Sequence, residues 1–224
     1  MQEIHLLVTL WLILLRKDKL LNSVNVLSID CDYANSVRSV TEITRFFLKH
    51  INKVDLKHII FSQVHSNIFY TLDPLRHQNK KVNLTHIDEH HDYYYKDVPI
   101  NSFQSDNWLG YYLLNYPSFI VNCHWLHNIN YEQLNFIASK MDPSLPDDIF
   151  SVSHEITDLS IDKFDYIFVC ESPHYSNPYS LTLYNVLVEI IKNNKQCEKN
   201  KFFKPNLVNH VVKEIGINIG HATQ

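Results

Sequence analysis

Short apolar runs alternate along the chain with segments whose apolar residues recur at helical spacing. The runs are rich in β-branched and aromatic residues and end in polar residues, which is typical of strands buried on both faces of a sheet. They predict strands over residues 25–32, 58–64, 118–123, 148–153 and 165–170, and one more that starts near Val82 and ends within 85–92. Helical spacing predicts helices over 36–50, 108–116, 131–141, 179–192 and 207–215, and residues 67–81 form a short helix or a loop.

The alternation of strand and helix predicts the fold class. Consecutive parallel strands need a crossover that usually contains a helix, and such helices cover both faces of the sheet. We therefore predict an α/β fold of three layers, α/β/α, around a largely parallel sheet. No internal repeat or linker divides the chain, so residues 1–224 are expected to form a single domain.

Both ends of the chain differ from this pattern. An apolar run of 11 residues, His5–Leu15, lies in an N-terminal extension of residues 1–24 and is too short to span a membrane. No small-residue cleavage site follows it, so we expect it to pack on the domain, with contact to another subunit of a homo-oligomer as the alternative. Residues 195–224 form a polar C-terminal tail.

The composition excludes several classes of function. A net charge of −4 argues against a general nucleic-acid-binding protein. Only 3 glycines are present, and the chain has no Gly-rich phosphate-binding motif. The 4 cysteines show no C-x-x-C spacing, so we expect free thiols in a reducing cytoplasm. We predict neither a nucleic-acid partner nor a membrane partner.

A cluster of metal-ligating residue types follows the apolar positions of the third predicted strand. Asp88, His90 and Asp92 are spaced two residues apart, so on a β-strand their side chains point to one side. Carboxylates with few imidazoles and no thiolate favour a hard or borderline cation such as Mn2+. We expect His86 and His91 to point away from this side and to take packing or supporting roles.

Other candidate ligands also lie where predicted strands end. Asp30 and Asp32 follow the first strand, His65 follows the second, and Glu171 follows the last. The carboxyl ends of parallel strands meet at one edge of the sheet, which is where α/β proteins bind their ligands. We therefore expect these residues to converge with the Asp-x-His-x-Asp cluster at one site.

These motifs resemble those of the arginase and deacetylase superfamily, and of the ureohydrolases in particular. Asp88–Asp92 (DEHHD) resembles the family's Asp-x-His-x-Asp signature, and Val64–Ser66 (VHS) is similar to the end of its Gly-Gly-Asp-His-Ser motif. Leu27–Asp32 (LSIDCD) resembles its Ser-Phe-Asp-Val-Asp strand, and Cys170–Pro173 (CESP) its closing strand-Glu-x-x-Pro segment, one residue shorter. The Asp-x-Asp strand comes first here and late in ordinary arginases. This rearranged strand order resembles a small branch of the fold that includes peptide arginases.

The resemblance implies a metal centre and an activity. One Mn2+ ion would be bound by His65, Asp88, Asp92 and Asp30, and a second by His90, Asp88, Asp30 and Asp32. The implied partner is an arginine-containing precursor peptide made by the ribosome, whose arginine side chains would be hydrolysed to ornithine with release of urea. Glu171 would hold the guanidinium group by paired charge-assisted hydrogen bonds.

Arginases place a proton-shuttling histidine after the Asp-x-His-x-Asp segment, but residues 93–107 contain none here. The candidate replacements, each near a predicted strand end, are His124, His127 and His154. The polar-aromatic stretch after the cluster is expected to form a substrate lip, because loops after strand ends carry function in α/β folds. Its candidate substrate-binding residues are Tyr93, Asn107 and Trp108.

Three alternatives remain open. A deacetylase-like metal amidohydrolase uses the same fold with a single zinc ion, but the Asp30/Asp32 pair together with two histidines favours two ions. A non-enzymatic member of the fold would bind a peptide through the aromatic stretch. A metallophosphatase is compatible with the ligand types, but no basic residue stands beside the motifs to hold phosphate.

Overall fold

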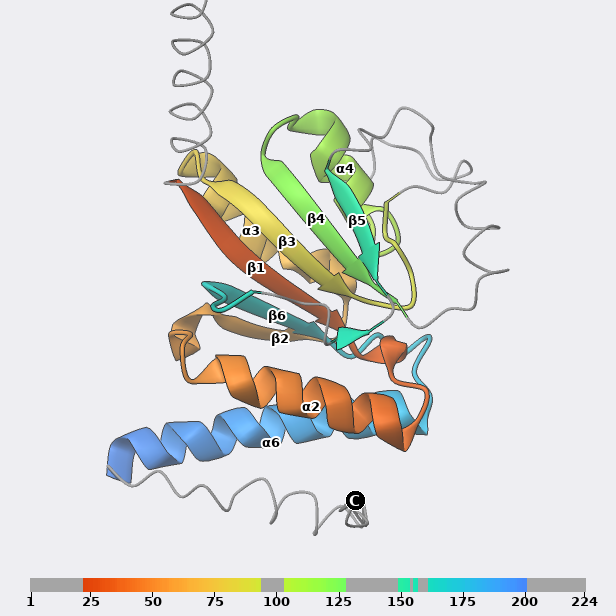
Figure 1. Ribbon diagram of the computed structural model, residues 1–224, viewed down its shortest axis with the longest axis vertical. Coiled ribbons are helices and arrows are strands. Elements are labelled where there is room, and N and C mark those ends of the chain that lie inside the picture. Colours follow the sequence, from red (N-terminus) through yellow and green to blue (C-terminus); the bar gives the residue numbers. More distant parts are fainter. Residues whose placement is uncertain (1–21, 94–102, 128–148, 154, 157–160, 201–224) are drawn as a thin grey trace, which may run out of the picture.

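The computed structural model (Figure 1) describes residues 22–93, 103–127, 149–153, 155–156 and 161–200. The N-terminal apolar run, the helices expected over 131–141 and 207–215, and His154 lie outside the described residues. The elements follow in the order β1 (Ser23–Asp30), η1 (Cys31–Tyr33), α2 (Val37–Ile51), η2 (Leu56–His58), β2 (Ile59–Ser62), η3 (His65–Ile68), α3 (Phe69–His77), β3 (Lys81–Ile87), α4 (Trp108–Asn115), β4 (Ile120–Leu126), β5 (Phe150–Ser153), β6 (Tyr166–Cys170) and α6 (Pro178–Asn200). None of the described helices combines the length and the apolar character needed to cross a membrane.

In the described part of the chain, six strands form one sheet in the order β2-β6-β1-β3-β4-β5, and every pairing is parallel. The prediction of an α/β fold with a largely parallel sheet is confirmed. The register aligns Ile29 of β1 with Ile87 of β3 and with Val169 of β6. Because these strands end side by side, Asp30 and Asp88 are placed next to each other at the carboxyl edge of the sheet.

Helices cover both faces of this sheet. α2 and α6 lie side by side on one face (Figure 1), over a core that includes Leu27, Ile29 and Val169. On the other face, Val26 and Val82 belong to a second core that contains residues of α3 and α4. β1 is therefore covered by apolar side chains on both sides, which is why its residues form a continuous apolar run in the sequence.

The start of α2 shows how local sequence sets an element boundary. Ser36 precedes the helix, and its hydroxyl accepts a hydrogen bond from the backbone N–H of Ser39 (3.2 Å). The Ser39 hydroxyl accepts one from the backbone N–H of Ser36 in return (3.1 Å). This reciprocal capping satisfies donors that have no partner within the helix. Buried Val40, Ile43 and Phe47 then recur at helical spacing and pack in the core.

β3 ends earlier than the sequence pattern indicated. Its last residue is Ile87, and no strand extends over residues 88–92. The Asp88 carboxylate accepts a hydrogen bond from the backbone N–H of His90 (2.6 Å), a local contact that competes with strand pairing. Asp92 has a φ of 50°, in the left-handed region, which redirects the chain again. The expectation that Asp88, His90 and Asp92 share one side of a strand is therefore wrong, and a turn brings them together instead.

Candidate metal centre

Two carboxylates reach the site from the end of β1. Asp30 is the last residue of the strand, and Asp32 lies in the turn η1 that follows directly. The Asp30 carboxylate accepts a hydrogen bond from the backbone N–H of Asp32 (3.3 Å), which caps the turn and keeps the two residues close. Both side chains are almost completely buried, where an unpaired carboxylate is costly.

His65 reaches this pair from the edge of the sheet, because it starts η3 shortly after the edge strand β2. Its ring is stacked on Phe168 of β6, with 5.7 Å between ring centroids. The ring nitrogen Nε2 lies 2.9 Å from the Ser28 hydroxyl. This contact leaves the other nitrogen, Nδ1, facing the carboxylates of Asp30 (2.9 Å), Asp92 (2.9 Å) and Asp88 (3.3 Å).

His90 meets the cluster from the solvent side. Its Nδ1 lies 3.1 Å from Asp32 Oδ2 and 3.5 Å from Asp88 Oδ1. The His90 side chain is 37% exposed, and the Tyr175 ring lies 5.4 Å away between centroids. His90 therefore connects the buried carboxylates with the surface.

The structure brings together all six metal ligands expected from the sequence, namely His65, Asp88, His90, Asp92, Asp30 and Asp32. Among the described residues, two groups have ligand atoms within 4.8 Å of one another: Asp32, Asp88 and His90, and His65, His86 and Asp88. Asp88 belongs to both groups. Two adjacent cation positions can therefore share this carboxylate, an arrangement suited to a two-metal site.

His86 belongs to the cluster, contrary to expectation. Its Nε2 lies 3.3 Å from Asp88 Oδ2. The side chain leaves β3 on the same face as the buried Val82 and Leu84, toward α3 and α4. Residues 86 and 88 are two apart, so on the strand that the sequence predicts their side chains share one side. That period is the sequence signal that identifies His86.

Charges within the cluster shift the pKa values of its members. Burial, together with the charges of the other aspartates, raises the pKa of Asp88 well above its usual value. Hydrogen bonds with Asp32 and Asp88 raise the pKa of His90 to about 12. Burial alone would lower the pKa of His65, but the neighbouring carboxylates outweigh it and raise that pKa. Protons therefore balance part of the negative charge of the metal-free cluster.

The unpartnered atoms of the cluster fit a metal centre. Asp32 Oδ1, Asp88 Oδ2 and both ring nitrogens of His86 are buried and form no hydrogen bond of good geometry in the described part of the chain. Buried polar atoms are nearly always paired, so this concentration indicates a ligand. Burial lowers the pKa of His86 to about 3, which leaves the neutral imidazole that a cation requires. Carboxylates and imidazoles form a donor set for a hard or borderline divalent cation.

Cation binding is expected to release protons. The raised pKa values of Asp88, His65 and His90 mean that protons compete with the cation for the same atoms. The apparent affinity for Mn2+ should therefore rise as the pH is raised from about 6 to about 8. Calorimetric titrations at one pH, in two buffers of different ionisation enthalpy, measure the number of protons released. Equal heats in both buffers, or an affinity that falls with pH, would contradict this expectation.

Trp108 supports the cluster from α4 and is completely buried. Its Nε1–H donates a hydrogen bond of 2.6 Å to Asp92 Oδ2, and its ring centroid lies 5.3 Å from those of His65 and His86. The backbone N–H groups of the next two residues of α4 donate to the carbonyl oxygen of Asp92. α4 therefore fixes both the side chain and the backbone of Asp92.

Replacing Trp108 by Phe removes this hydrogen bond but keeps an aromatic ring against the two histidines. We expect the Mn2+ affinity to fall about 10- to 100-fold, the usual cost of losing a group that orients a metal ligand. Competition with a chelating dye measures the affinity. Tyr112→Phe is the matched control, since the buried Tyr112 lies on the same helix and packs against Tyr116 and Phe119. Unchanged affinity in both variants would show that Trp108 does not orient Asp92.

A cavity of about 740 Å³ lies over the cluster. Five cluster residues contribute to its lining: Asp30, Asp32, His65, His90 and Asp92. The rest of the lining consists of Ser66, Phe103, Gln104, Ser105, Asp106, Ser172 and Tyr175. None of these described lining residues is Lys or Arg. The cavity is therefore acidic.

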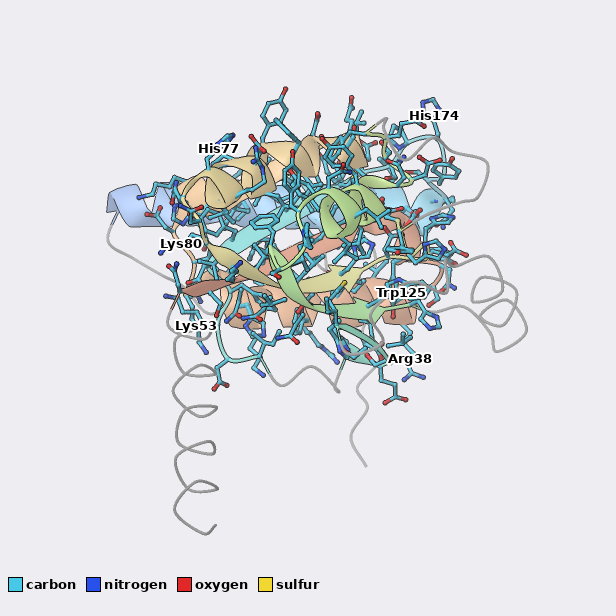
Figure 2. The ribbon with its side chains drawn as sticks, turned by 90° about the horizontal axis from the view of Figure 1, so that it is seen from above. Arg38, Lys53, His77, Lys80, Trp125 and His174 are labelled. Carbon is cyan, nitrogen blue, oxygen red and sulfur yellow. The ribbon has the colours of Figure 1, made fainter. Side chains whose placement is uncertain are left out.

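The location of the labelled lysines agrees with this charge distribution. The Trp125 Nε1–H donates to the backbone carbonyl of Asp88 (3.1 Å), so Trp125 marks the end of the molecule that carries the cluster. Figure 2 shows Trp125, His174 and Arg38 at this end, and Lys53 and Lys80 at the opposite end. Arg38 pairs with Glu42 (2.7 Å) and does not line the cavity. These two lysines therefore lie far from the acidic cavity.

The three residues expected to bind substrate are buried instead. Tyr93, Asn107 and Trp108 have almost no exposed surface, and none of them lines the cavity. Residues 103–106, which precede Asn107 and Trp108 on the return to α4, line it in their place. The backbone N–H of Gln104 donates to Asn107 Oδ1 (2.8 Å), so the buried Asn107 side chain stabilises the backbone of this segment. We therefore assign Tyr93, Asn107 and Trp108 to support of the site.

Glu171 follows β6 directly but is not among the residues that line the cavity. Its carboxylate accepts a hydrogen bond of 3.4 Å from the side chain of Gln63. The next residue, Ser172, has a φ of 49°, lines the cavity and donates a hydrogen bond to the Asp30 carboxylate. The position of Glu171 therefore gives no support to guanidinium binding, and Ser172 is a site residue for which the sequence carried no signal.

Two of the candidate proton-shuttling histidines, His124 and His127, do not line the cavity. The two ring nitrogens of His124 each lie 2.7 Å from a hydroxyl group of β5, those of Ser151 and Ser153. His127 is completely buried and packs against Trp125, with 4.4 Å between ring centroids. His154 lies outside the described residues. The positions of His124 and His127 thus give no support to a role in proton transfer.

Comparisons with known proteins do not place the chain in a family. No family model matches the sequence, and searches of curated proteins and of solved structures found no match. The function is therefore proposed from the residues and geometry of the site, together with the resemblance of its motifs to those of ureohydrolases.

Proposed function

We propose that this protein is a binuclear manganese hydrolase that converts arginine side chains of a peptide to ornithine and releases urea. The observation that carries the proposal is the position of Asp88, which belongs to one group of ligands with His65 and to another with His90. A carboxylate shared by two adjacent cations is suited to hydrolases with two-metal sites. The resemblance of the same residues to ureohydrolase motifs supports the reaction.

One Mn2+ ion would be held by His65, Asp88, Asp92 and Asp30, and the other by His90, Asp88, Asp30 and Asp32. When bound, such a pair supplies the acidity that generates hydroxide from water near neutral pH. The chain's own contribution is to orient these ligands. Hydrogen bonds from Ser172 and Trp108 fix Asp30 and Asp92, and Ser28 fixes the ring of His65.

The charge of the cavity supports a cationic substrate. Two divalent ions would neutralise the four cluster aspartates, which leaves Asp106 as the acidic residue of the described lining. A guanidinium group donates hydrogen bonds and accepts none, and Asp106, Gln104 and Ser105 all offer acceptor oxygens. A phosphate ester would need Lys or Arg, so the described lining argues against a metallophosphatase. In this proposal Asp106 takes the role that the sequence pattern assigned to Glu171.

A peptide is the proposed substrate, rather than free arginine, because the resemblance is to peptide arginases. Tyr175 lines the cavity and yet is 67% exposed, next to His90. An exposed ring beside the cavity offers a flat apolar surface for residues that flank the arginine.

The full-length protein, loaded with Mn2+, tests the proposal by mass spectrometry. It is incubated separately with an arginine-containing peptide, with free arginine, and with an acetyl-lysine peptide that contains no arginine. A loss of about 42 Da from the arginine peptide alone is the expected result. The same loss from free arginine would indicate a small-molecule ureohydrolase, and a loss from the acetyl-lysine peptide alone a deacetylase. No change in any substrate would favour the non-enzymatic peptide-binding alternative.

Asp106→Asn should raise the KM for the arginine peptide about 10- to 100-fold, because a hydrogen bond to a charged group contributes about 1.5–3 kcal/mol. The value of kcat should change much less, since Asp106 lies outside the group of metal ligands. Steady-state kinetics measure both constants. Glu89→Gln is the control, as it makes the same type of change at a residue that does not line the cavity. Equal KM values for the two variants would remove Asp106 from substrate binding.

A further inference from the structure

We propose that His86 is itself a metal ligand, so that one of the two cation positions contains two imidazoles. The inference rests on the proposed binuclear centre and adds a residue to its six ligands. It comes from the local geometry of His86, which the ureohydrolase motifs do not include.

The position of the His86 ring nitrogen fits a shared cation. His86 Nε2 lies 3.3 Å from Asp88 Oδ2 and 3.9 Å from Asp92 Oδ2. Donor atoms that bind one divalent cation at about 2.0–2.2 Å lie about 3–4 Å from one another. His65, which also faces Asp88 and Asp92, has its ring centroid 5.4 Å from that of His86. The four side chains therefore fit around one ion.

A hydrogen bond does not account for the contact between His86 and Asp88. Neither ring nitrogen of His86 forms a hydrogen bond of good geometry among the described residues, although the backbone of His90 lies close enough to act on the pKa of the ring, and Asp88 Oδ2 forms none either. The two atoms lie 3.3 Å apart without the alignment that a hydrogen bond requires. His86 Nε2 and Asp88 Oδ2 thus lie close together without forming a hydrogen bond. This arrangement is expected when both atoms bind a third atom, here a cation.

The surroundings of His86 hold its ring in this position. The parallel register places His86 beside Ser28 of β1, and Ser28 contacts the Nε2 atom of His65. On the outer side, the Trp108 ring meets the His86 ring edge to face at 5.3 Å and 88°. His86 has no exposed surface, so an unliganded ring nitrogen there is costly. The two imidazoles thus approach the same point from two elements, η3 and β3.

The two cation positions would then differ in their donors. The position formed by His65, His86, Asp88 and Asp92 contains two imidazoles, whereas the position at His90 and Asp32 contains one. Imidazole suits Fe2+, Ni2+ and Zn2+, and carboxylate-rich sites suit Mn2+. Co2+ falls between Fe2+ and Ni2+ in the order of affinities. When Co2+ is limiting, we therefore expect it to enter the His86 position first.

Counting the imidazoles on the first cation tests the proposal on the unaltered chain. The full-length protein, with 14N- or 15N-labelled histidine, is loaded with one equivalent of Co2+ and studied by ENDOR spectroscopy. Nitrogen couplings from two imidazoles are expected, those of His65 and His86. A single coupled imidazole overturns the proposal. This readout does not depend on a variant that folds.

A matched pair of variants provides the second measurement. His86→Gln should weaken binding of the first Co2+ more than about 100-fold, beyond the effect of losing a residue that merely orients a ligand. His50→Gln is the control, because His50 is equally buried but lies between Phe46 and Phe164 in the opposite core. A smaller loss in His86→Gln, with the number of imidazole couplings unchanged, would overturn the proposal in favour of a positioning role.

The outcomes also separate this inference from the proposed function. If the parent protein binds two cations and the first is coupled to one imidazole, His86 is not a ligand and the binuclear hydrolase remains. If the parent protein binds no cation, both proposals fail. Two cations with two imidazoles on the first, but no change of any substrate, would support His86 and contradict the hydrolase.

Discussion

Asp88→Asn is expected to abolish binding of both proposed cations and to lower the proposed hydrolytic activity about 10³-fold or more. Asp88 is the residue that the two groups of candidate ligands share, so its replacement affects both positions at once. A neutral amide is also a poorer bridge between two cations than a carboxylate. Metal analysis of the dialysed protein and the mass-spectrometric assay measure the two effects.

The same substitution should stabilise the metal-free protein. The pKa of Asp88 is raised in the folded state by burial and by the neighbouring aspartates. A carboxyl group whose pKa is raised on folding loses stabilising free energy as the pH rises from its unfolded value through the raised value. Asparagine does not ionise, so this loss is absent and the melting temperature at neutral pH should be higher.

Glu89→Gln is the control for both effects, because Glu89 is adjacent in sequence and belongs to neither ligand group. It should keep both cations, the activity and the melting temperature of the parent protein. Retention of two cations by Asp88→Asn would contradict the bridging position of Asp88. A lower melting temperature of its metal-free form would contradict the repulsion among the buried aspartates.

Saturation with Mn2+ should raise the melting temperature by about 10 °C, and a chelator should reverse the change. A free cation concentration about 1,000 times Kd stabilises the folded state by about 4 kcal/mol. In a domain of this size, each kcal/mol shifts the melting temperature by about 2–4 °C. The physical source is neutralisation of the buried aspartates, which otherwise repel one another.

Differential scanning fluorimetry with and without EDTA measures this shift. Asp88→Asn is the reference, because its cation positions are removed while the rest of the chain is unchanged. A shift of equal size in Asp88→Asn would place the stabilising cation somewhere other than the cluster.

The strands and helices were largely predictable because their patterns are local. The apolar run at 25–32 became β1 over Ser23–Asp30, and the helical spacing at 36–50 became α2 over Val37–Ile51. The order of strands was not predictable in this way. β6 is the last described strand along the chain, yet it lies between β2 and β1 in the sheet. Such a pairing depends on contacts between segments that are distant in sequence.

The site residues that lie at strand ends were predictable from the sequence. The site residues that a backbone turn brings into place were not. Asp30 and His65 follow apolar runs, and a parallel sheet brings such positions together. A residue such as Trp108 is different, since composition does not reveal whether an aromatic ring lines a cavity or packs beneath it. Ser172 reaches the cavity because its backbone adopts a φ of 49°, a local conformation that the residue types do not specify.

The contact between Asp92 and the start of α4 has a consequence for how this scaffold can diversify. Leu109 and Gly110 donate to the Asp92 carbonyl, and a Cβ atom on Gly110 would lie 1.5 Å from the carbonyl oxygen of Tyr93. The chain that leaves at Tyr93 therefore returns to the same place at α4. Position 110 therefore accepts only glycine as long as α4 stays in contact with Tyr93, and this one residue type constrains the backbone that holds Asp92.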